Sequence, residues 1–313
     1  MRLRILDAGA DQFPEWWTAA AIRSGFNVVS TRPDAVVLPM PLHTWTSGDF
    51  ERASDFAAAA RVPTVVYDPF DSWDDPSRGW RGDQSWTADV QHYVLRATIV
   101  AGPQLPAEGG PAHPVPLPYP PVVRRVPAPP DLGSSTVDVH FAGVFRDEGW
   151  AAPPHDTRNR HYRGHLVATL QRALPDHRLA IRNVEYRSEP QEGRSRLRRQ
   201  YVAELDRSTM VLAPAGFGYL TFRHSDAWAR GRVLLSEPVQ RHIAVPEPQR
   251  WQSGEVAVLY DPLRDDIADV VAKSLKCRKG LADIARAGWE YGRRWTAPEA
   301  QVAALVHAIS EHG

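Results

Sequence analysis

The chain has 313 residues, enough for two domains of ordinary size, and is 43% hydrophobic and 24% charged, which is typical of a soluble globular protein. Basic and acidic residues balance at 37 each, which argues against a nucleic-acid or membrane-surface partner bound mainly by charge. The single cysteine, Cys277, excludes an intrachain disulfide.

Two further patterns bear on location. The N-terminal residues run directly into a strand pattern and lack the apolar stretch of a signal peptide. No window approaches the roughly 20 apolar residues of a membrane span. We therefore expect a cytoplasmic protein.

Strand and helix patterns alternate through the first hundred residues. Strands are expected at residues 3–6, 28–29, 35–38, 64–67 and 98–101, and helices at 14–24, 50–60 and 88–95. Alternation of this length predicts a doubly wound parallel sheet. We assign residues 1–101 to an N-terminal, acceptor-side Rossmann-like domain.

The next segment, residues 102–135, differs in composition. It is dense in proline and glycine and lacks helical periodicity. This composition is typical of an extended connection with polyproline character, so we interpret it as an interdomain linker. A docking ligand for a proline-binding partner is the alternative interpretation.

A second alternating pattern follows the linker. Strands are expected at residues 137–141, 210–213 and 233–235, and helices at 163–174, before 208, and at 222–230, 265–279, 281–291 and 298–310. Polar segments at 153–160 and 187–199 are interpreted as loops. The second domain covers residues 136–295, and the helix within 296–313 is a candidate to cross back to the N-terminal domain.

The segment from residue 201 to 239 is the most informative. An apolar strand ends at Pro214, Gly216-Phe217-Gly218 open a loop, and Thr221 is placed to cap the next helix, which Gly231 ends. In a parallel sheet, such a strand end faces a helix N-terminus across a glycine loop. Free N–H groups and the helix dipole converge there, which suits a phosphate group.

This order of residues resembles the donor-binding core of exostosin-like glycosyltransferases, and more broadly the C-terminal half of GT-B enzymes. The resemblance covers roughly residues 137–262 and includes the strand before Ala142-Gly143 and the helix from Arg163. It implies two Rossmann-like domains with a cleft between them. It also implies an enzyme that transfers a sugar from a nucleotide sugar to an acceptor hydroxyl, with a small molecule or glycan as acceptor. One departure is Asp226, where the family usually has glutamate.

The resemblance places donor-binding residues along the second domain. Gly216, Phe217, Gly218 and Thr221 would form the phosphate loop. Arg223 lies in the first helical turn, where a cation opposes the dipole unless an anion binds; an ion pair with Asp226 is the alternative. Further donor candidates are Arg146 for diphosphate and Asp226 and Glu237 for ribose or sugar hydroxyls; for Arg146 and Glu237 the alternative is a solvated loop charge.

The catalytic base should come from the first domain. Asp11 lies in the first strand–helix loop and is our candidate by placement, with Asp68, Asp71 and His43 as alternatives; a solvated loop role is the other interpretation for Asp11. Other residues that follow strands of this domain are acceptor-side candidates, although each is also compatible with an ordinary loop role: His43, Trp45, Asp68, Asp71 and Trp73.

No metal-ligand spacing or Asp-x-Asp triplet is present, so we expect a metal-independent reaction with the nucleotide-diphosphate sugar as co-substrate and no further cofactor. A non-catalytic sugar- or nucleotide-binding protein, or a partner protein on a degenerate GT-B scaffold, is the alternative hypothesis. A dinucleotide enzyme fits less well, because the first loop has one glycine where the fingerprint has three.

Overall fold

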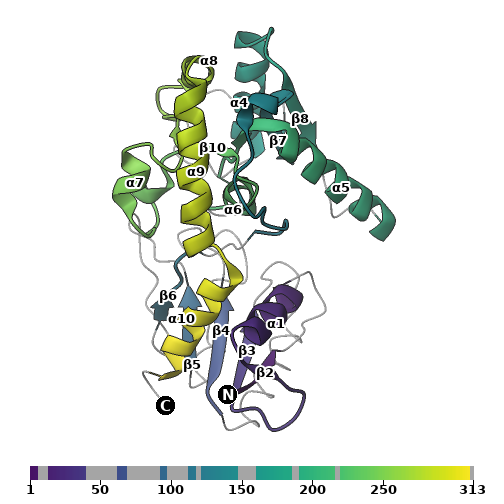
Figure 1. The fold of residues 1–313 in the computed structure, drawn as a ribbon, viewed down its shortest axis with the longest axis vertical. Coiled ribbons are helices and arrows are strands. Elements are labelled where there is room, and N and C mark those ends of the chain that lie inside the picture. The colour runs from purple at the N-terminus through teal and green to yellow at the C-terminus, as the bar shows by residue number, and fades with distance from the viewer. Residues whose placement is uncertain are drawn as a thin grey trace. The chain divides into compact units, whose positions relative to one another are not determined.

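The structure is a computed structural model that describes residues 1–5, 13–39, 62–68, 92–96, 112–117, 121–146, 160–184, 190–215 and 219–310. The chain divides into two compact units. The first unit contains Met1–Pro118, His242–Pro246 and Trp295–Gly313, and the second contains Tyr119–Arg241 and Glu247–Arg294. Figure 1 shows the helices and strands of both units.

The first unit is built on a six-stranded parallel sheet. The order is β2-β1-β3-β4-β5-β6, and the strands are β1 (Arg2–Ile5), β2 (Asn27–Val28), β3 (Ala35–Pro39), β4 (Thr64–Asp68), β5 (His92–Arg96) and β6 (Ala112–Pro114). Its core joins strand residues such as Leu3, Val37 and Val65 to helices α1 (Phe13–Arg23) and α10 (Pro298–Ser310). The last helix, α10, therefore packs against a sheet formed by the first part of the chain.

The prediction of a helix at residues 88–95 is wrong for residues 92–95, the part that the structure describes. Residues 92–96 form β5, which pairs in parallel with β4 and with β6. The segment contains Tyr93 and Val94, which favour extended backbone, and pairing on both sides overrides local helix propensity. β6 also lies within the segment that we interpreted as a linker. Pro114 is tolerated there because an edge strand needs hydrogen bonds on one side only.

The second unit contains a five-stranded parallel sheet in the order β11-β10-β9-β7-β8. Its strands are β7 (Val137–Gly143), β8 (Leu179–Asn183), β9 (Ser208–Leu212), β10 (Val233–Ser236) and β11 (Val258–Leu259), and its helices are α4 (Arg160–Ala173), α5 (Gln191–Arg207), α6 (Phe222–Ala229), α7 (Pro248–Gln252), α8 (Ile267–Leu275) and α9 (Arg278–Trp295). Single-turn 3-10 helices occupy Leu132–Ser134 and Val239–Arg241. The parallel sheets confirm the predicted α/β class.

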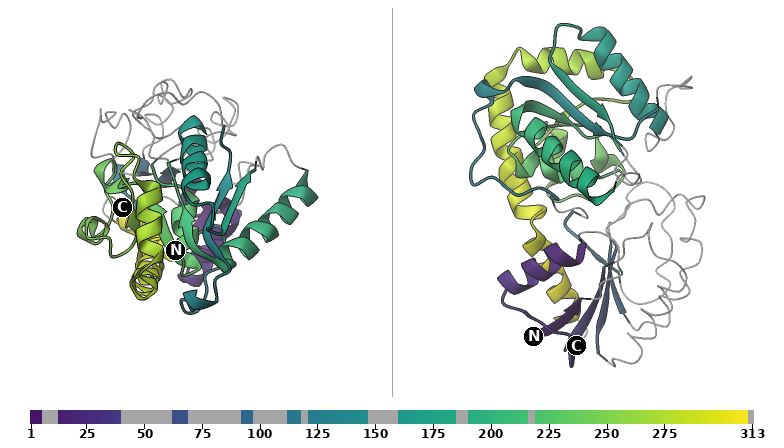
Figure 2. Two further views of the ribbon diagram at one scale, coloured as in Figure 1. Left: turned by 90° about the horizontal axis from the view of Figure 1, so that it is seen from above. Right: turned by 90° about the vertical axis from the view of Figure 1, so that its right-hand side faces the viewer.

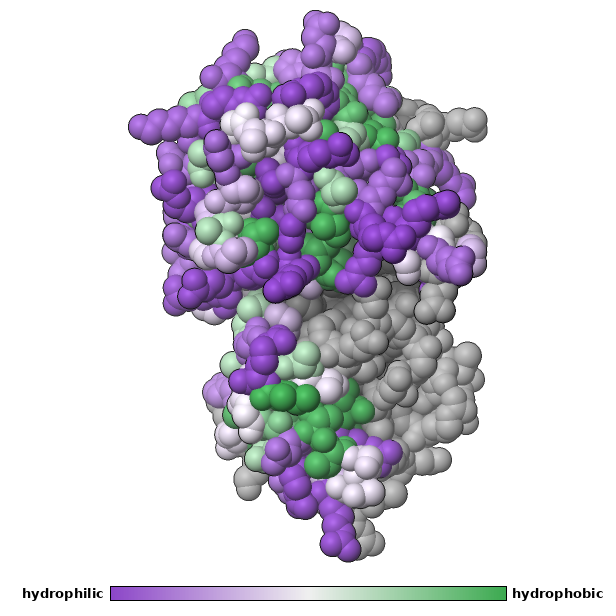
Figure 3. All heavy atoms as spheres, turned by 45° about the vertical axis from the view of Figure 1, so that its right-hand side comes forward, coloured by the Kyte–Doolittle hydropathy of each residue, from purple (hydrophilic) through white to green (hydrophobic). Residues whose placement is uncertain are grey.

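The central strands of this sheet are buried on both faces, as their apolar sequences require. Val139 and Phe141 of β7 face a core that includes Tyr162 and Leu166 of α4. Figure 2 shows helices on both sides of this sheet. On the face drawn in Figure 3, hydrophilic residues cover most of the described surface of the upper part, as expected when the apolar residues are internal.

One expected loop and one expected helix boundary differ from the structure. The polar residues expected to form a loop at 187–199 are largely helical, because α5 begins at Gln191 and its second half packs on the sheet through Tyr201 and Leu205. The two helices expected at 265–279 and 281–291 are present as α8 and α9, but the break between them lies at Lys276 and Cys277, earlier than expected.

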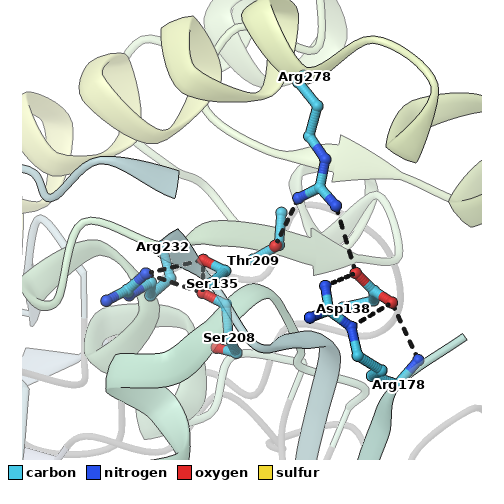
Figure 4. A network of polar contacts seen from close by, with 7 residues as sticks. All are labelled: Ser135, Asp138, Arg178, Ser208, Thr209, Arg232 and Arg278. Atoms are coloured by element: carbon cyan, nitrogen blue, oxygen red, sulfur yellow. Dashed lines mark hydrogen bonds and ion pairs between the residues drawn. The ribbon is translucent and has the colours of Figure 1, made fainter. Parts of the chain in front are cut away.

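The amino ends of the strands in the second sheet are joined by arginines (Figure 4). Buried Arg232 donates through Nη1 to the Ser208 carbonyl oxygen at 2.9 Å. Asp138 accepts from the Arg178 backbone N–H at 2.9 Å and lies 3.5 Å from Nη2 of Arg278, whose Nη1 donates to Thr209 Oγ1. These contacts stabilise the edge opposite to the strand ends that carry the candidate site.

Candidate functional site

The candidate site lies at the carboxyl edge of the second sheet. β7, β9 and β10 end there, at Gly143, Leu212 and Ser236. Helices α4 and α6 begin at the same edge, because each follows a strand of the sheet. Their N-terminal N–H groups therefore point toward this edge, and ligands of open parallel sheets bind at this position.

The loop between β9 and α6 is anchored at both ends. At its start, the Ala215 N–H donates to Glu237 Oε1 at 2.8 Å, and both residues are buried. At its end, Thr221 is the N-cap residue of α6, as predicted. Gly216, Phe217 and Gly218 lie outside the described residues.

His224 fixes the second anchor. Its Nδ1 accepts from the Thr221 N–H at 3.0 Å, and its Nε2 lies 3.0 Å from Ser236 Oγ, which in turn donates to the Glu237 carbonyl oxygen at 2.8 Å. Burial lowers the pKa of His224 to about 3, so the ring is neutral and one nitrogen is free to accept. The start of α6 is thereby tied to the end of β10.

Arg223 extends from the first turn of α6 to the end of β7. Its Nε donates to the Ala142 carbonyl oxygen at 2.8 Å, and its guanidinium lies 5.1 Å from the centre of the Phe141 ring. A Cβ atom on Gly143 would lie 2.1 Å from Arg223 Nη2, so the close approach requires glycine at this position. The packing of Arg223 is thus with β7, while its charge contributes to the environment of Asp226.

Arg163 was not singled out by the sequence. It lies in the first turn of α4 and joins two strand ends, because Nε donates to the Ala215 carbonyl oxygen at 2.9 Å and Nη1 to that of Val144 at 3.0 Å. A cation in the first turn of a helix opposes the dipole, the same signal that drew attention to Arg223. Applied to both helices, that argument would have found it.

The remaining donor-side candidates have different environments. Arg146 follows β7 and is exposed at the same edge. Glu237 is only 1% exposed, so the alternative of a solvated surface acid is wrong. Asp226 is fully buried and accepts three hydrogen bonds from within the unit, so direct contact with a ribose would require those bonds to be lost.

The candidates of the first unit fall mostly outside the described residues. Asp68 is the last residue of β4, at the carboxyl end of a strand of the parallel sheet. The following candidates lie outside the described residues: Asp11, His43, Trp45, Asp71 and Trp73. Their roles remain predictions.

Two properties of the described residues concern metals and membranes. No three His, Cys, Asp or Glu side chains among them converge in a way that could hold a metal ion. None of the helices in the described part of the chain has the length and apolar character that crossing a membrane requires.

No protein-family model and no curated protein matches this chain. Among solved structures, it is similar to a glycosyltransferase from Rickettsia africae ESF-5, with a TM-score of 0.50 and 8% identity, over 99% of this chain and 97% of that chain. It is also similar to the GtfA/B complex, with a TM-score of 0.44 and 12% identity, over 88% of this chain and 57% of that chain. A third similar structure is CalG4, the calicheamicin glycosyltransferase, with a TM-score of 0.37 and 14% identity, over 95% of this chain and 77% of that chain. At 8% identity the first likeness shows the fold alone, which is the predicted Rossmann-like α/β fold of the GT-B type.

Proposed function

We propose that this protein is a glycosyltransferase that moves a sugar from a nucleotide-sugar donor to an acceptor hydroxyl. The observation that carries the proposal is the convergence of Arg223, Arg163 and the N-terminus of α6 at the carboxyl edge of the second sheet. Three sources of positive potential at one edge favour an anion such as a diphosphate.

The proposed chemistry assigns a role to each part of this edge. Departure of the nucleotide leaves negative charge on the diphosphate, and oriented N–H groups and guanidinium groups stabilise it as it develops. Arg223, Arg146 and the loop of Gly216, Phe217 and Gly218 are assigned to the diphosphate. Thr221 caps the helix behind that loop, and Glu237 holds the first residue of the loop in place.

We further propose that the reaction is independent of metal ions, because arginines and helix N–H groups take over the charge stabilisation that a cation would supply. Asp11 remains our proposed base for the acceptor hydroxyl. His43, Trp45, Asp68, Asp71 and Trp73 remain the proposed acceptor-side residues. Their assignment depends on the GT-B likeness of the first domain, in which strand-end loops face the acceptor.

The test is isothermal titration of the purified protein with UDP, GDP, dTDP, ADP and CMP, with and without magnesium. We expect one nucleotide to bind without magnesium, and Arg223→Ala to weaken its binding. Loss of one hydrogen bond to a charged group is worth about 1–3 kcal/mol, which corresponds to about a 5- to 150-fold increase in Kd.

Arg172→Ala is the matched control, because Arg172 is an exposed arginine in the last turn of α4, at the opposite end of that helix. It should leave Kd unchanged. Equal affinity in wild type and Arg223→Ala would remove Arg223 from the donor site.

The burial of Asp226, which the family resemblance placed on the ribose, favours a second candidate function: a non-catalytic nucleotide- or sugar-binding protein on this scaffold. Incubation of the protein with the sugar form of the bound nucleotide separates the two. Slow hydrolysis of that donor without any acceptor supports the transferase, whereas tight binding with no turnover toward water or any acceptor supports the second candidate.

A further inference from the structure

Asp226 connects α6 to a chain segment that no sequence pattern linked to it. Both carboxylate oxygens are in use: Oδ1 accepts from the N–H groups of Val122 and Val123 at 2.9 and 3.3 Å, and Oδ2 accepts from the Tyr201 hydroxyl at 3.0 Å. The side chain has no exposed surface. These hydrogen bonds offset part of the cost of burying the carboxylate and fix its position.

The segment that Asp226 holds, residues 121–126, is here named the strap. Further hydrogen bonds join the strap to α6: the Val126 N–H donates to the Ala229 carbonyl oxygen at 2.9 Å, and Nη1 of Arg230 donates to the Arg124 carbonyl oxygen at 2.6 Å. Asp226 thus acts at the middle of α6, and the other two contacts act at its end.

The strap is also bonded to the two neighbouring helices. Arg198 of α5 donates to the Val122 carbonyl oxygen, and Trp289 of α9 donates through Nε1 to the Val126 carbonyl oxygen at 3.1 Å. Arg125 of the strap donates through Nη2 to the Gly292 carbonyl oxygen at 2.8 Å. With α5, α6 and α9 all attached, the strap is a fixed support along α6.

Asp226 follows Arg223 by three residues, so the two lie on the same face of α6 about one turn apart. A shift of α6 away from the strap would move Arg223 relative to β7, because the helix is rigid over one turn. Such a shift would also draw His224 away from Ser236 of β10, and a His224 ring that rotates to keep that contact would lose the hydrogen bond from the Thr221 N–H. The strap contact therefore controls the position of the residues that the proposed function assigns to the diphosphate.

We propose that Asp226 is a positioning residue that fixes α6 on the strap, and not a ligand of the ribose. This inference rests on the proposed function for its consequence in donor binding, but its structural content does not. The shorter side chain of aspartate, one methylene less than glutamate, suits this role, because its carboxylate reaches the backbone N–H groups of the strap while fully buried.

The first experiment is amide hydrogen exchange on the nucleotide-free protein, in wild type, Asp226→Ala and Asp226→Asn. In Asp226→Ala we expect exchange at Val122 and Val123 to accelerate about 10-fold or more, as for loss of a hydrogen bond to a charged group. Exchange at Thr221 should accelerate with them. The amide of Ala213, which donates to Leu235 across the sheet, is the internal control and should be unchanged.

Asp226→Asn is the variant that keeps the shape and one acceptor oxygen, so it should restore most of the protection at Val122 and Val123. It also keeps the experiment interpretable if Asp226→Ala does not fold. Acceleration confined to Val122 and Val123, with Thr221 unchanged in both variants, would show a purely local contact and overturn the positioning role.

The second experiment distinguishes positioning from ribose binding. Kd is measured for the nucleotide that binds in the panel above and for its 2′-deoxy and 3′-deoxy forms, in wild type and Asp226→Asn. If Asp226 only positions α6, removal of a ribose hydroxyl costs the same factor in both proteins. A factor that disappears in Asp226→Asn would make Asp226 a ribose ligand and refute the proposal.

The failures of the two proposals are distinguishable. If no nucleotide binds, the proposed function fails, while the exchange measurement still decides whether Asp226 positions the head of α6. If a nucleotide binds and Thr221 exchange is unaffected by Asp226, the function stands and the positioning role fails.

Discussion

Gly143→Ala tests the placement of Arg223 without any knowledge of a ligand. A Cβ atom at this position would lie 2.1 Å from Arg223 Nη2, which is the mobile end of a flexible side chain, and 3.3 Å from Cζ of Phe141. We therefore expect the arginine to move and the strand to stay. The loss is then limited to the contacts of the guanidinium with Ala142 and the Phe141 ring.

The expected magnitude follows from those contacts. The hydrogen bond from Nε to the Ala142 carbonyl oxygen is worth about 1 kcal/mol net, and the cation–π contact about 0.5–1 kcal/mol at a partly exposed site. Gly143→Ala should therefore lower the free energy of unfolding by about 1–2 kcal/mol. In an Arg223→Ala background the same substitution should cost no more than about 0.5 kcal/mol, because the clashing group is absent.

The assay is a double-mutant cycle with urea unfolding, in which wild type, Gly143→Ala, Arg223→Ala and the double variant are compared at one pH. Additive losses would show that Gly143 and Arg223 do not interact and would refute the geometry. For nucleotide binding, the two single variants should weaken affinity by similar factors, and the double variant should be no weaker than Arg223→Ala alone.

Asp226→Asn should change the pH dependence of stability. Burial raises the pKa of Asp226 to about 7, while Tyr201, the strap N–H groups and Arg223 oppose the shift. Because the pKa is higher in the native state, that state binds more protons than the unfolded state between pH ~4 and ~7. The free energy of unfolding of wild type should therefore fall relative to that of Asp226→Asn as pH rises through this window, by at most about 4 kcal/mol. Urea midpoints of the two proteins that change in parallel from pH 5 to 8 would contradict this. Gly292→Ala should destabilise by about 1–3 kcal/mol, because its Cβ would lie 2.5 Å from the Cβ of buried Trp228 and α9 must shift. A melting temperature equal to wild type would contradict the packing. Gly254→Ala is the comparison, because it is strained through its positive φ while its Cβ would make only an ordinary contact, 3.7 Å from the Ala257 carbonyl oxygen.

Local patterns predicted the elements that carry the strongest signals. The apolar strands around Val211 and Leu234 are buried on both faces and lack alternation, so they were recognisable as central parallel strands. The end of α6 was also predictable. Gly231 has a φ of 62°, and the N–H groups of Gly231 and Arg232 bond to Trp228 and Ala227 in the Schellman arrangement, which explains the glycine signal.

Predictions failed where pairing partners decide the structure. Residues 92–96 and 112–114 became strands because β4 and then β5 offered an open edge, which no local pattern records. The first half of α5 is rich in arginine and was interpreted as a loop, although arginine is a good helix former. The helical content there follows from the packing of its second half through Tyr201.

For the candidate site, the sequence by itself determined the end of β9 before Pro214, the cap of α6 at Thr221 and the place of Arg223 in the first helical turn, because each depends on residues close together in the chain. Only the tertiary structure decided what these residues contact. Arg163 joins two strand ends, and Asp226 accepts from Val122, about a hundred residues earlier. The physical reason is that the orientation of a side chain depends on the donors and acceptors that the fold brings to it, and those come from segments that local patterns cannot relate.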